Sequence, residues 1–527
     1  MNIITKFYII IFYYLLLYKE TMDNKTKKCV SGCKLLDRSI CSRSTRCKFV
    51  DGQTRKYCRL SSKYKMNKSN CNVVKRIKKT EARKRIGNYF MKIINESNEK
   101  KSQYLKAICS DSGVCIAFGI NRDKITKFFA NFNNFEYVEP PIKRLGKPSN
   151  NGFVKEIKYK KHDYIAYAAL KSSAAPDSDN LAYEYIVGQF INQQCKFFPC
   201  FLETYGLFYY TSEASWKNMR DSVTITTNTI KKALIKGSPT DYSKMCKDSK
   251  KAAILIQHLK GVFTIDDLFE NPTRDTINLV CYDLLYILYQ VYMPLAFLKN
   301  NFTHYDLHKG NVLIYEPIKG KYIHYHYHIG NGETVSFKSP YIAKIIDYGR
   351  SFFKYKGTTG NLNAADIYKK ICAEPDCGSC GEDYGFEWME GPLSNSNYFI
   401  SSQMPNMSHD LRLLNELKKP LTTINKHVSK IPTINSLGLN ALNDLTQNVK
   451  YGNGIKGSEK VYGTNINKKN GFPSSINNVA DAERSLREII LQNEDIYNLN
   501  ESIYIPDNKI GDIHVYVDGS PMKYEPA

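Results

Sequence analysis

The chain has 527 residues, of which 42% are hydrophobic and 24% charged, a composition typical of globular proteins. Its length exceeds what one hydrophobic core usually serves, which excludes a single small domain and predicts two or three domains. The net charge of +24 favours an anionic partner, such as nucleic acid, a membrane surface or an acidic protein, although codon bias in an AT-rich genome would equally explain the frequent Lys, Asn and Tyr.

Residues 7–18 form an apolar run between Lys6 and Lys19. A membrane-spanning helix needs about 20 residues, so this run is too short to cross a bilayer. Its length fits the core of a signal peptide, but no small-residue cleavage site follows it. We interpret residues 1–20 as an interfacial or packing element or an upstream-start artefact, with a membrane role as the alternative.

The stretch from Lys25 to Lys106 is dense in Lys and Arg. It also contains six cysteines: Cys29, Cys33, Cys41, Cys47, Cys58 and Cys71. Only the first two have a spacing close to that of zinc ligands, so reduced thiols are the default, with a zinc site or a disulfide-linked region as alternatives. The basic run at 75–85 is interpreted as a solvated helix face in preference to a phosphate-binding segment.

A turn bounded by Gly146 and Gly152 separates two runs with strand character in the segment Leu145 to Val154. Glycine permits a close approach of the backbone to a phosphate, but this spacing is not the usual G-x-G-x-x-G. Tyr164 to Lys171 is predicted to be the next strand, with the lysine at its end.

A helix is predicted over Leu181 to Asn192, and it carries Glu184. Ala252 to Leu259 is a buried-strand run with a polar end at Gln257. That polar end is predicted to mark a hinge between two parts of the chain, an assignment that depends on the order of the elements alone.

Arg274 to Tyr292 has the apolar period of an amphipathic helix, which Pro294 is expected to end. Beyond this helix, Asp306 lies five residues before Asn311, just ahead of an apolar run. That run, Val312 to Tyr315, is β-branched and aromatic, so it predicts a short strand that fixes the loop from its far side.

A hairpin is predicted from Tyr322 to Phe337, with the two-residue turn Asn331-Gly332. Alternation places three histidines on one face of its first strand: His324, His326 and His328. A metal could be chelated there, but a solvated or stacking face is favoured because no carboxylate or cysteine is evidently placed beside them.

Ile342 to Gly349 is a buried-strand pattern that ends in Asp347, Tyr348 and Gly349. About sixty residues follow before Ser408, including Cys372, Cys377 and Cys380. The spacing of Cys377 and Cys380 resembles half of a zinc site, but little in the sequence supplies the other half.

A helix is predicted from Ser408 to Leu417, capped by the serine and ended before Pro420. Loops or partial disorder are expected over 421–475, which is rich in Asn, Gly, Ser and Lys. A helix is predicted over Val479 to Gln492 and a short strand over Asp512 to Val517.

Five polar residues therefore occur in a fixed order, each in a compatible local setting: Lys171, Glu184, Asp306, Asn311 and Asp347. With this set the chain resembles a eukaryotic-type protein kinase over roughly Lys143 to Leu417, and most closely the divergent serine/threonine kinases of giant, mimivirus-like DNA viruses. The resemblance implies an α+β, two-lobed protein-kinase-like fold with a basic, Cys-containing N-terminal extension and a C-terminal extension.

The implied domains follow the chain in order. They are a hydrophobic segment at 1–20, a basic extension at 21–140, a kinase-like domain at 141–420 with its N-lobe at about 141–260 and its C-lobe from about 261, and an extension at 421–527 that completes or flanks the C-lobe.

The resemblance also assigns roles. Asp306 would accept the proton of the substrate hydroxyl, and Asn311 and Asp347 would hold Mg²⁺. Lys171 would contact the ATP phosphates, with Glu184 paired to it. The nucleotide would be bound by Leu145, Gly146, Gly152, Val154, Lys171, Gln257 and Leu259.

The implied activity is ATP-dependent phosphoryl transfer to Ser or Thr hydroxyls of proteins, in the host cytoplasm or the virion. A small-molecule kinase of the aminoglycoside or choline type is one alternative, because His308 stands where serine/threonine kinases usually carry Lys. Another is a virion protein on a kinase fold that binds nucleic acid or membrane through its basic N-terminal region. The long segment after Asp347 favours protein substrates.

The resemblance also bears on activation. Asp410 matches the buried aspartate that braces the catalytic loop, whereas Tyr305 replaces the arginine that many kinases neutralise by phosphorylation. Arg350 is basic but lies beyond the loop. We therefore expect Asp306 to be held by Asp410 and packing alone, and the enzyme to be active without phosphorylation.

Overall fold

The computed structural model describes short segments between residues 47 and 119, most of residues 122–363, short segments between 366 and 399, and most of residues 405–451 and 475–527. The chain divides into two compact units, Met1–Asn95 and Glu96–Ala527. In the first unit, β1 (Cys47–Asp51) pairs antiparallel with β2 (Lys56–Leu60). Within the second, β3 (Ile108–Cys109) pairs with β4 (Cys115–Ile116).

Several predictions fall outside the described residues. They concern the apolar run at 7–18, the basic run at 75–85, the middle of the glycine-bounded turn at 147–151, and the cysteines Cys29, Cys33, Cys41, Cys71, Cys372, Cys377 and Cys380.

The largest sheet has seven antiparallel strands in the order β10-β8-β11-β7-β6-β5-β9. Its strands are β5 (Val138–Leu145), β6 (Gly152–Lys161), β7 (Tyr164–Ser173), β8 (Thr204–Tyr210), β9 (Thr224–Ile225), β10 (Leu234–Lys236) and β11 (Ala252–His258). Buried and half-buried side chains alternate along most of β6 because successive side chains point to opposite faces. The register places Lys171 of β7 opposite Val154 of β6. The strands expected to start at Phe153, Tyr164 and Ala252 are confirmed.

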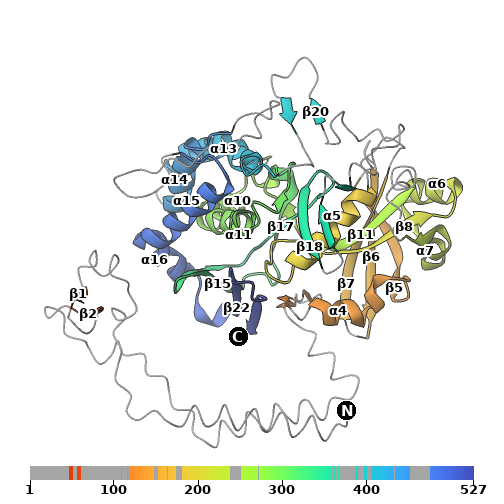
Figure 1. The fold of residues 1–527 in the computed structure, drawn as a ribbon, viewed down its shortest axis with the longest axis horizontal. Helices are drawn as coiled ribbons and strands as arrows, with labels where there is room; N and C mark the ends of the chain where they lie inside the picture. The colour runs from red at the N-terminus through yellow and green to blue at the C-terminus, as the bar shows by residue number, and fades with distance from the viewer. Residues whose placement is uncertain are drawn as a thin grey trace, which may run out of the picture. The chain divides into compact units, whose positions relative to one another are not determined.

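Helices cover this sheet (Figure 1). They are α4 (Arg122–Phe128), the 3₁₀ turn η5 (Ala130–Phe132), α5 (Leu181–Gln194), α6 (Glu213–Asp221) and α7 (Thr227–Ala233). Leu181 of α5 packs against Leu207 and Ile254 of β8 and β11. The helix predicted around Glu184 is therefore confirmed, and packing on the sheet fixes its position.

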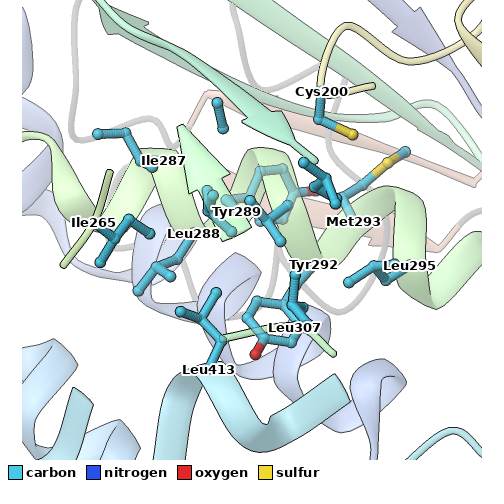
Figure 2. Packing of buried hydrophobic residues seen from close by; sticks show 14 of the residues in the cluster. Cys200, Ile265, Ile287, Leu288, Tyr289, Tyr292, Met293, Leu295, Leu307 and Leu413 are labelled. Carbon is cyan, nitrogen blue, oxygen red and sulfur yellow. The ribbon is translucent and has the colours of Figure 1, made fainter. Parts of the chain in front are cut away.

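The helical part of the unit is centred on α10 (Arg274–Tyr282) and α11 (Leu284–Phe297), where a single helix ended by Pro294 was expected. That expectation is wrong: the axis bends by 52° between the two helices, and Pro294 lies inside α11. An interior proline removes one backbone hydrogen bond, but every residue from Leu284 to Leu295 is buried, and this burial outweighs the loss. Figure 2 shows Leu288 and Tyr292 in this core with Leu307 and Leu413.

The buried helix α11 raises the question of a membrane span. Over the described residues, no helix alone has the length and apolarity needed to cross a bilayer, and α10 and α11 meet that criterion only together, as a bent pair.

The helix predicted at Ser408 begins later and runs further than expected. The serine precedes a 3₁₀ turn, η8 (His409–Leu411), without making a side-chain cap, and α13 (Arg412–Val428) continues through Pro420. A buried apolar stripe extends beyond the proline to Val428, and its packing holds the helix together. The end expected before Pro420 is therefore wrong.

The expectation of loops over 421–475 is also wrong in part, since α13 extends into this range and α14 (Leu437–Gln447) follows. The helix α15 (Val479–Gln492) has the predicted bounds, and α16 (Glu494–Ile503) comes next, followed by the turn η9 (Pro506–Asn508). In Figure 1, α13 to α16 gather with α10 and α11 on the side of the unit away from α6 and α7.

The predicted hairpin is confirmed as β15 (Tyr322–Gly330) and β16 (Glu333–Ser339). Asn331 and Gly332 both have positive φ, 50° and 76°, as a tight two-residue turn requires. β22 (Lys509–Tyr516), which contains most of the strand predicted at 512–517, pairs parallel with β15. With β23 (Lys523–Pro526) they form a four-stranded sheet in the order β16-β15-β22-β23.

Small sheets complete the described part of the unit. Their strands are β12 (Phe263–Thr264), β13 (Phe302–Thr303), β14 (Val312–Tyr315), β17 (Ile342–Ile345), β18 (Phe352–Gly357), β19 (Gly360–Asn363), β20 (Glu387–Met389) and β21 (Asn397–Phe399), with the short helices α9 (Asp267–Glu270) and η7 (Lys309–Asn311) between some of them. Antiparallel pairing of Val312 with Ile345 brings the start of β14 beside the end of β17. The loop that ends at Asn311 therefore meets the segment that begins at Ile346. The fold is mixed α and β with mainly antiparallel sheets, which agrees with the α+β class.

Candidate active site

Lys171, Glu184 and Asp347 meet although they come from three separate elements. The ammonium of Lys171, on β7, lies 2.8 Å from Glu184 Oε2 of α5 and 2.8 Å from Asp347 Oδ1, just after β17. The glutamate side chain is 5% exposed, whereas that of Asp347 is 39% exposed. The predicted pairing of Lys171 with Glu184 is confirmed. The lysine thus has one partner inside the protein and one that a solvent-borne ligand can reach.

Asp347 has a strained backbone and a stabilised charge. Its φ of 67° lies in the left-handed region, which costs a non-glycine residue about 1 kcal/mol. Attraction to Lys171 holds the pKa of its carboxyl below the usual value and outweighs the partial loss of hydration. The next residue, Tyr348, is buried, and its hydroxyl donates to the Ile345 carbonyl at 2.6 Å. This anchor fixes the turn that presents the carboxylate.

Asp410 supports the loop that precedes Asp306. The backbone N–H groups of His304 and Tyr305 donate to the two carboxylate oxygens of Asp410, at 2.8 Å and 3.0 Å. Tyr305 has a φ of 62° and a fully buried side chain. Burial raises the pKa of Asp410 to about 7, while the two N–H donors favour its charged form. The sequence predicted this bracing contact.

His304 joins this loop to the Asp347 turn. Its Nε2 lies 2.9 Å from the Ile346 carbonyl, and its Nδ1 accepts the backbone N–H of Asp306 at 3.2 Å. Burial lowers the pKa of the imidazole. Because Nδ1 accepts a hydrogen bond, Nε2 is the nitrogen that donates to the Ile346 carbonyl. The imidazole therefore couples the backbone position of Asp306 to that of Asp347.

Asn311 lies at the other end of the loop. Its side-chain NH₂ donates to the Asp306 carbonyl at 2.8 Å, and its own carbonyl accepts the N–H of Ile346 at 3.1 Å. Because the NH₂ is used in this way, the side-chain oxygen is the atom suited to a cation. Asn311 and Asp347 thus flank the junction between the two segments with hard oxygen ligands of the type that Mg²⁺ prefers.

Two arginines contact the Asp306 carboxylate, which the sequence reasoning missed. Arg412, at the start of α13, lies 2.7 Å from Oδ1, and Arg350 lies 3.6 Å from Oδ2. The expectation that Asp306 is held by Asp410 and packing alone is therefore wrong, and Arg350 reaches the carboxylate although it lies beyond the loop in sequence. One local signal was present, because Arg412 stands two residues after the bracing aspartate.

The side chain of His308 turns back on its own loop. Its Nδ1 accepts the backbone N–H of Gly310 at 3.0 Å, which caps η7. The neighbouring Lys309 lies 2.6 Å from Asp266. Neither contact is made with Asp306.

The predicted nucleotide-binding residues lie around the large sheet. Leu145 pairs with Val154 at the hairpin end, and Gly146 has a φ of 66°. A side chain on Gly152 would collide with the Ser172 carbonyl. This close approach explains the glycine without reference to a phosphate.

Two further predicted nucleotide-binding residues lie at the end of β11. The backbone N–H of Gln257 donates to the Glu203 carbonyl at 2.8 Å, and Leu259 is buried. The N–H of Gln257 is thus engaged within the protein, and the following residue, His258, is still paired with Tyr167 of β7.

No protein-family model matches the chain, and no curated protein matches it. The local geometry is therefore what bears on function. It combines a lysine between two carboxylates, a carboxylate on a braced loop, and an amide and a carboxylate on two segments that the pairing of β14 with β17 brings together.

Proposed function

We propose that this protein transfers the terminal phosphoryl group of ATP to serine or threonine hydroxyls of protein substrates. One observation carries the proposal: Lys171 lies 2.8 Å from both Glu184 and Asp347, and Asp347 follows the segment that His304 ties to Asp306. A cation for the phosphates, a metal ligand and a base are thus assembled from distant parts of the sequence.

The architecture supports a two-lobed kinase-like fold. The antiparallel order β8-β11-β7-β6-β5, with α5 packed against β8 and β11, provides the lysine and its glutamate partner. The helical part provides α11 ahead of the loop and Asp410 beneath it. In a kinase, the same division separates nucleotide binding from the catalytic loop.

The residues support a direct mechanism. Asp306 accepts the proton as the substrate hydroxyl oxygen attacks the γ-phosphorus, and the bond to the bridging oxygen breaks to release ADP. Lys171 holds the phosphates, and Glu184 keeps the lysine in place. Bound at Asn311 and Asp347, Mg²⁺ would neutralise charge on the transferred group.

A small-molecule hydroxyl is the second candidate acceptor, and His308 favours it. Serine/threonine kinases usually carry a lysine at this position, beside the base, whereas the side chain of His308 here accepts the N–H of Gly310 and caps η7. The base is contacted instead by Arg412 and Arg350. The choice between acceptors therefore depends on a substrate assay.

The test is transfer of label from γ-³²P-ATP to basic proteins, peptides and amino-alcohols, each assayed with and without Mg²⁺. Wild type should label serine or threonine, and Asp306→Asn and Asp347→Asn should each reduce the rate at least about 100-fold. Asp507→Asn, at an exposed aspartate in η9, is the matched control and should retain the rate. Wild-type activity in Asp347→Asn would contradict the site, and label found only in amino-alcohols would favour the second candidate.

A further inference from the structure

The sheet β16-β15-β22-β23, which we call the histidine sheet, has two different faces. Tyr325 and Tyr327 of β15 point into the hydrophobic core and are fully buried. The alternate residues of β15 lie on the other face, where they are 18–25% exposed at His324 and His326. In the parallel register, His324 lies opposite Asp512 and His326 opposite His514.

This register corrects the expectation that no carboxylate lies beside the histidines. Asp512 Oδ1 is 3.0 Å from His326 Nε2 and 3.5 Å from His324 Nδ1. One ligand atom from each of the three residues lies within 4.8 Å of the others. Zinc bonds of about 2.0–2.1 Å in a tetrahedral arrangement place ligand atoms about 3.3 Å apart. Small side-chain movements would therefore bring all three atoms to one ion.

We propose that His324, His326 and Asp512 bind one Zn²⁺ ion, with a fourth position open to water. Two imidazoles and one carboxylate are common zinc ligands, and the imidazoles disfavour Mg²⁺ and Ca²⁺, which take oxygen ligands. The partial exposure of the three side chains gives the ion a path from solvent. The site is separate from the proposed phosphoryl transfer and does not depend on it.

Neighbouring groups hold the ligands in suitable orientations. His326 Nδ1 lies 3.0 Å from the Ser336 hydroxyl, which can either donate or accept a hydrogen bond. The ring can therefore donate from Nε2 to Asp512 without metal, or present the Nε2 lone pair to an ion while Nδ1–H donates to the serine. Lys509 contacts the other carboxylate oxygen, Oδ2, so Oδ1 remains the oxygen that faces the imidazoles.

The stacked rings beside the site restrict its shape further. The rings of His326 and His514 stack at 4.6 Å, and those of His328 and Tyr516 at 4.7 Å. This row fixes the rotamer of His326, so the chain pre-organises one ligand. The ion would also join β15 to β22, where His326 and Asp512 are 186 positions apart in the sequence. Zinc should therefore stabilise the attachment of the C-terminal strands.

The test uses the full chain after treatment with a chelator and dialysis. Zinc is titrated in, bound metal is measured by mass spectrometry, and thermal unfolding is recorded. Wild type should bind one equivalent of zinc more than His324→Gln or Asp512→Asn, or bind that equivalent at least about tenfold more tightly. Only wild type should show the corresponding zinc-dependent rise in Tm. His427→Gln, on the exposed side of α13, is the control and should behave as wild type.

Any zinc bound by cysteines elsewhere in the chain would be the same in all variants. The difference in bound zinc between wild type and the two variants therefore measures this site alone. Equal stoichiometry and affinity in wild type and Asp512→Asn would overturn the proposal. Wild type provides a second measurement that needs no variant to fold. In histidine-selective NMR, zinc should shift the signals of His324 and His326 and leave that of His427 unchanged, whereas unchanged signals from the histidine sheet would equally overturn the proposal.

Discussion

At the candidate active site, Glu184, Asp347 and Asp306 each contact a cation, whereas in the histidine sheet Asp512 is shared between Lys509 and two imidazole rings. Lys171 lies between Glu184 and Asp347, and Arg412 contacts Asp306. In the sheet, burial lowers the pKa of His324 to about 4, so its imidazole is uncharged at neutral pH. The first arrangement suits an anionic substrate that displaces existing ion pairs, and the second offers lone pairs to a metal.

The two sites also differ in how they are held. The loop that carries Asp306 is held by ion pairs and by hydrogen bonds to its backbone N–H groups. These contacts are buried, so removing one partner leaves the other polar group without a hydrogen bond. The histidine sheet is held by strand pairing and by the tyrosines on its far face. Removing a charge should therefore damage the active site severely and the sheet only slightly.

If the candidate site depends on buried charge in this way, Asp410→Asn should show the largest effect among variants outside the proposed base and metal ligands. An amide of the same size cannot accept both N–H groups of His304 and Tyr305, because one of its ends is itself a donor. We expect kcat to fall about 100-fold as the loop shifts, with little change in KM for ATP. Steady-state kinetics would measure this, with Asp507→Asn as the control.

The pH dependence of kcat provides a second test of Asp410→Asn. The raised pKa of Asp410, about 7, means that it gains a proton as the pH falls below 7 and loses its acceptor capacity for two N–H groups. Wild-type kcat should therefore decline below pH 7, and Asp410→Asn should lack this decline. The effect of Asp410 on stability runs in the other direction. Its pKa is higher in the folded than in the unfolded state, so the contribution of Asp410 to the free energy of unfolding falls as the pH rises from about 4 to 7. A wild-type kcat in the variant would contradict the bracing role.

The sequence was informative wherever the determining contacts are local. Asp306, Asn311 and the strand after them lie within ten residues, so their spacing alone indicated the loop. Arg412 meets Asp306 across 106 positions and Asp512 meets His326 across 186, and no local pattern reveals such pairs. The candidate base was therefore predictable, but its cationic partners and the carboxylate beside the histidines were not.

The errors in the helix ends have a related cause. Pro294 and Pro420 are helix breakers by propensity, yet both lie inside helices. Their helices bury apolar stripes against the core, and this tertiary burial outweighs one missing backbone hydrogen bond. Burial is set by the whole fold, so a short window of sequence cannot weigh it against local propensity.

A smaller effect is expected when Asp306 loses its arginine. Arg412→Gln removes the cation at 2.7 Å from Oδ1 and leaves Arg350 at 3.6 Å from Oδ2. We expect kcat to fall about tenfold, since one charge-assisted hydrogen bond to the base is lost. Arg274→Gln, at an exposed residue of α10, is the control. Restoration of kcat by Arg412→Lys would show that charge is what matters, and an unchanged kcat in Arg412→Gln would mean that the contact does not position the base.

The smallest effect is expected from removal of phosphate. At the position where many kinases carry an arginine, this chain has Tyr305, whose buried ring lies 4.9 Å from that of His409. The arginines that could receive a phosphate, Arg412 and Arg350, already face Asp306 in the unphosphorylated chain. Phosphatase-treated protein should therefore keep its initial rate within about twofold, because no unbalanced cation has to be neutralised before the loop is ordered. A tenfold loss that is reversed when phosphate returns to the segment 351–408 would show that these arginines have a phosphorylated partner, and that the ion pairs with Asp306 belong to an inactive state.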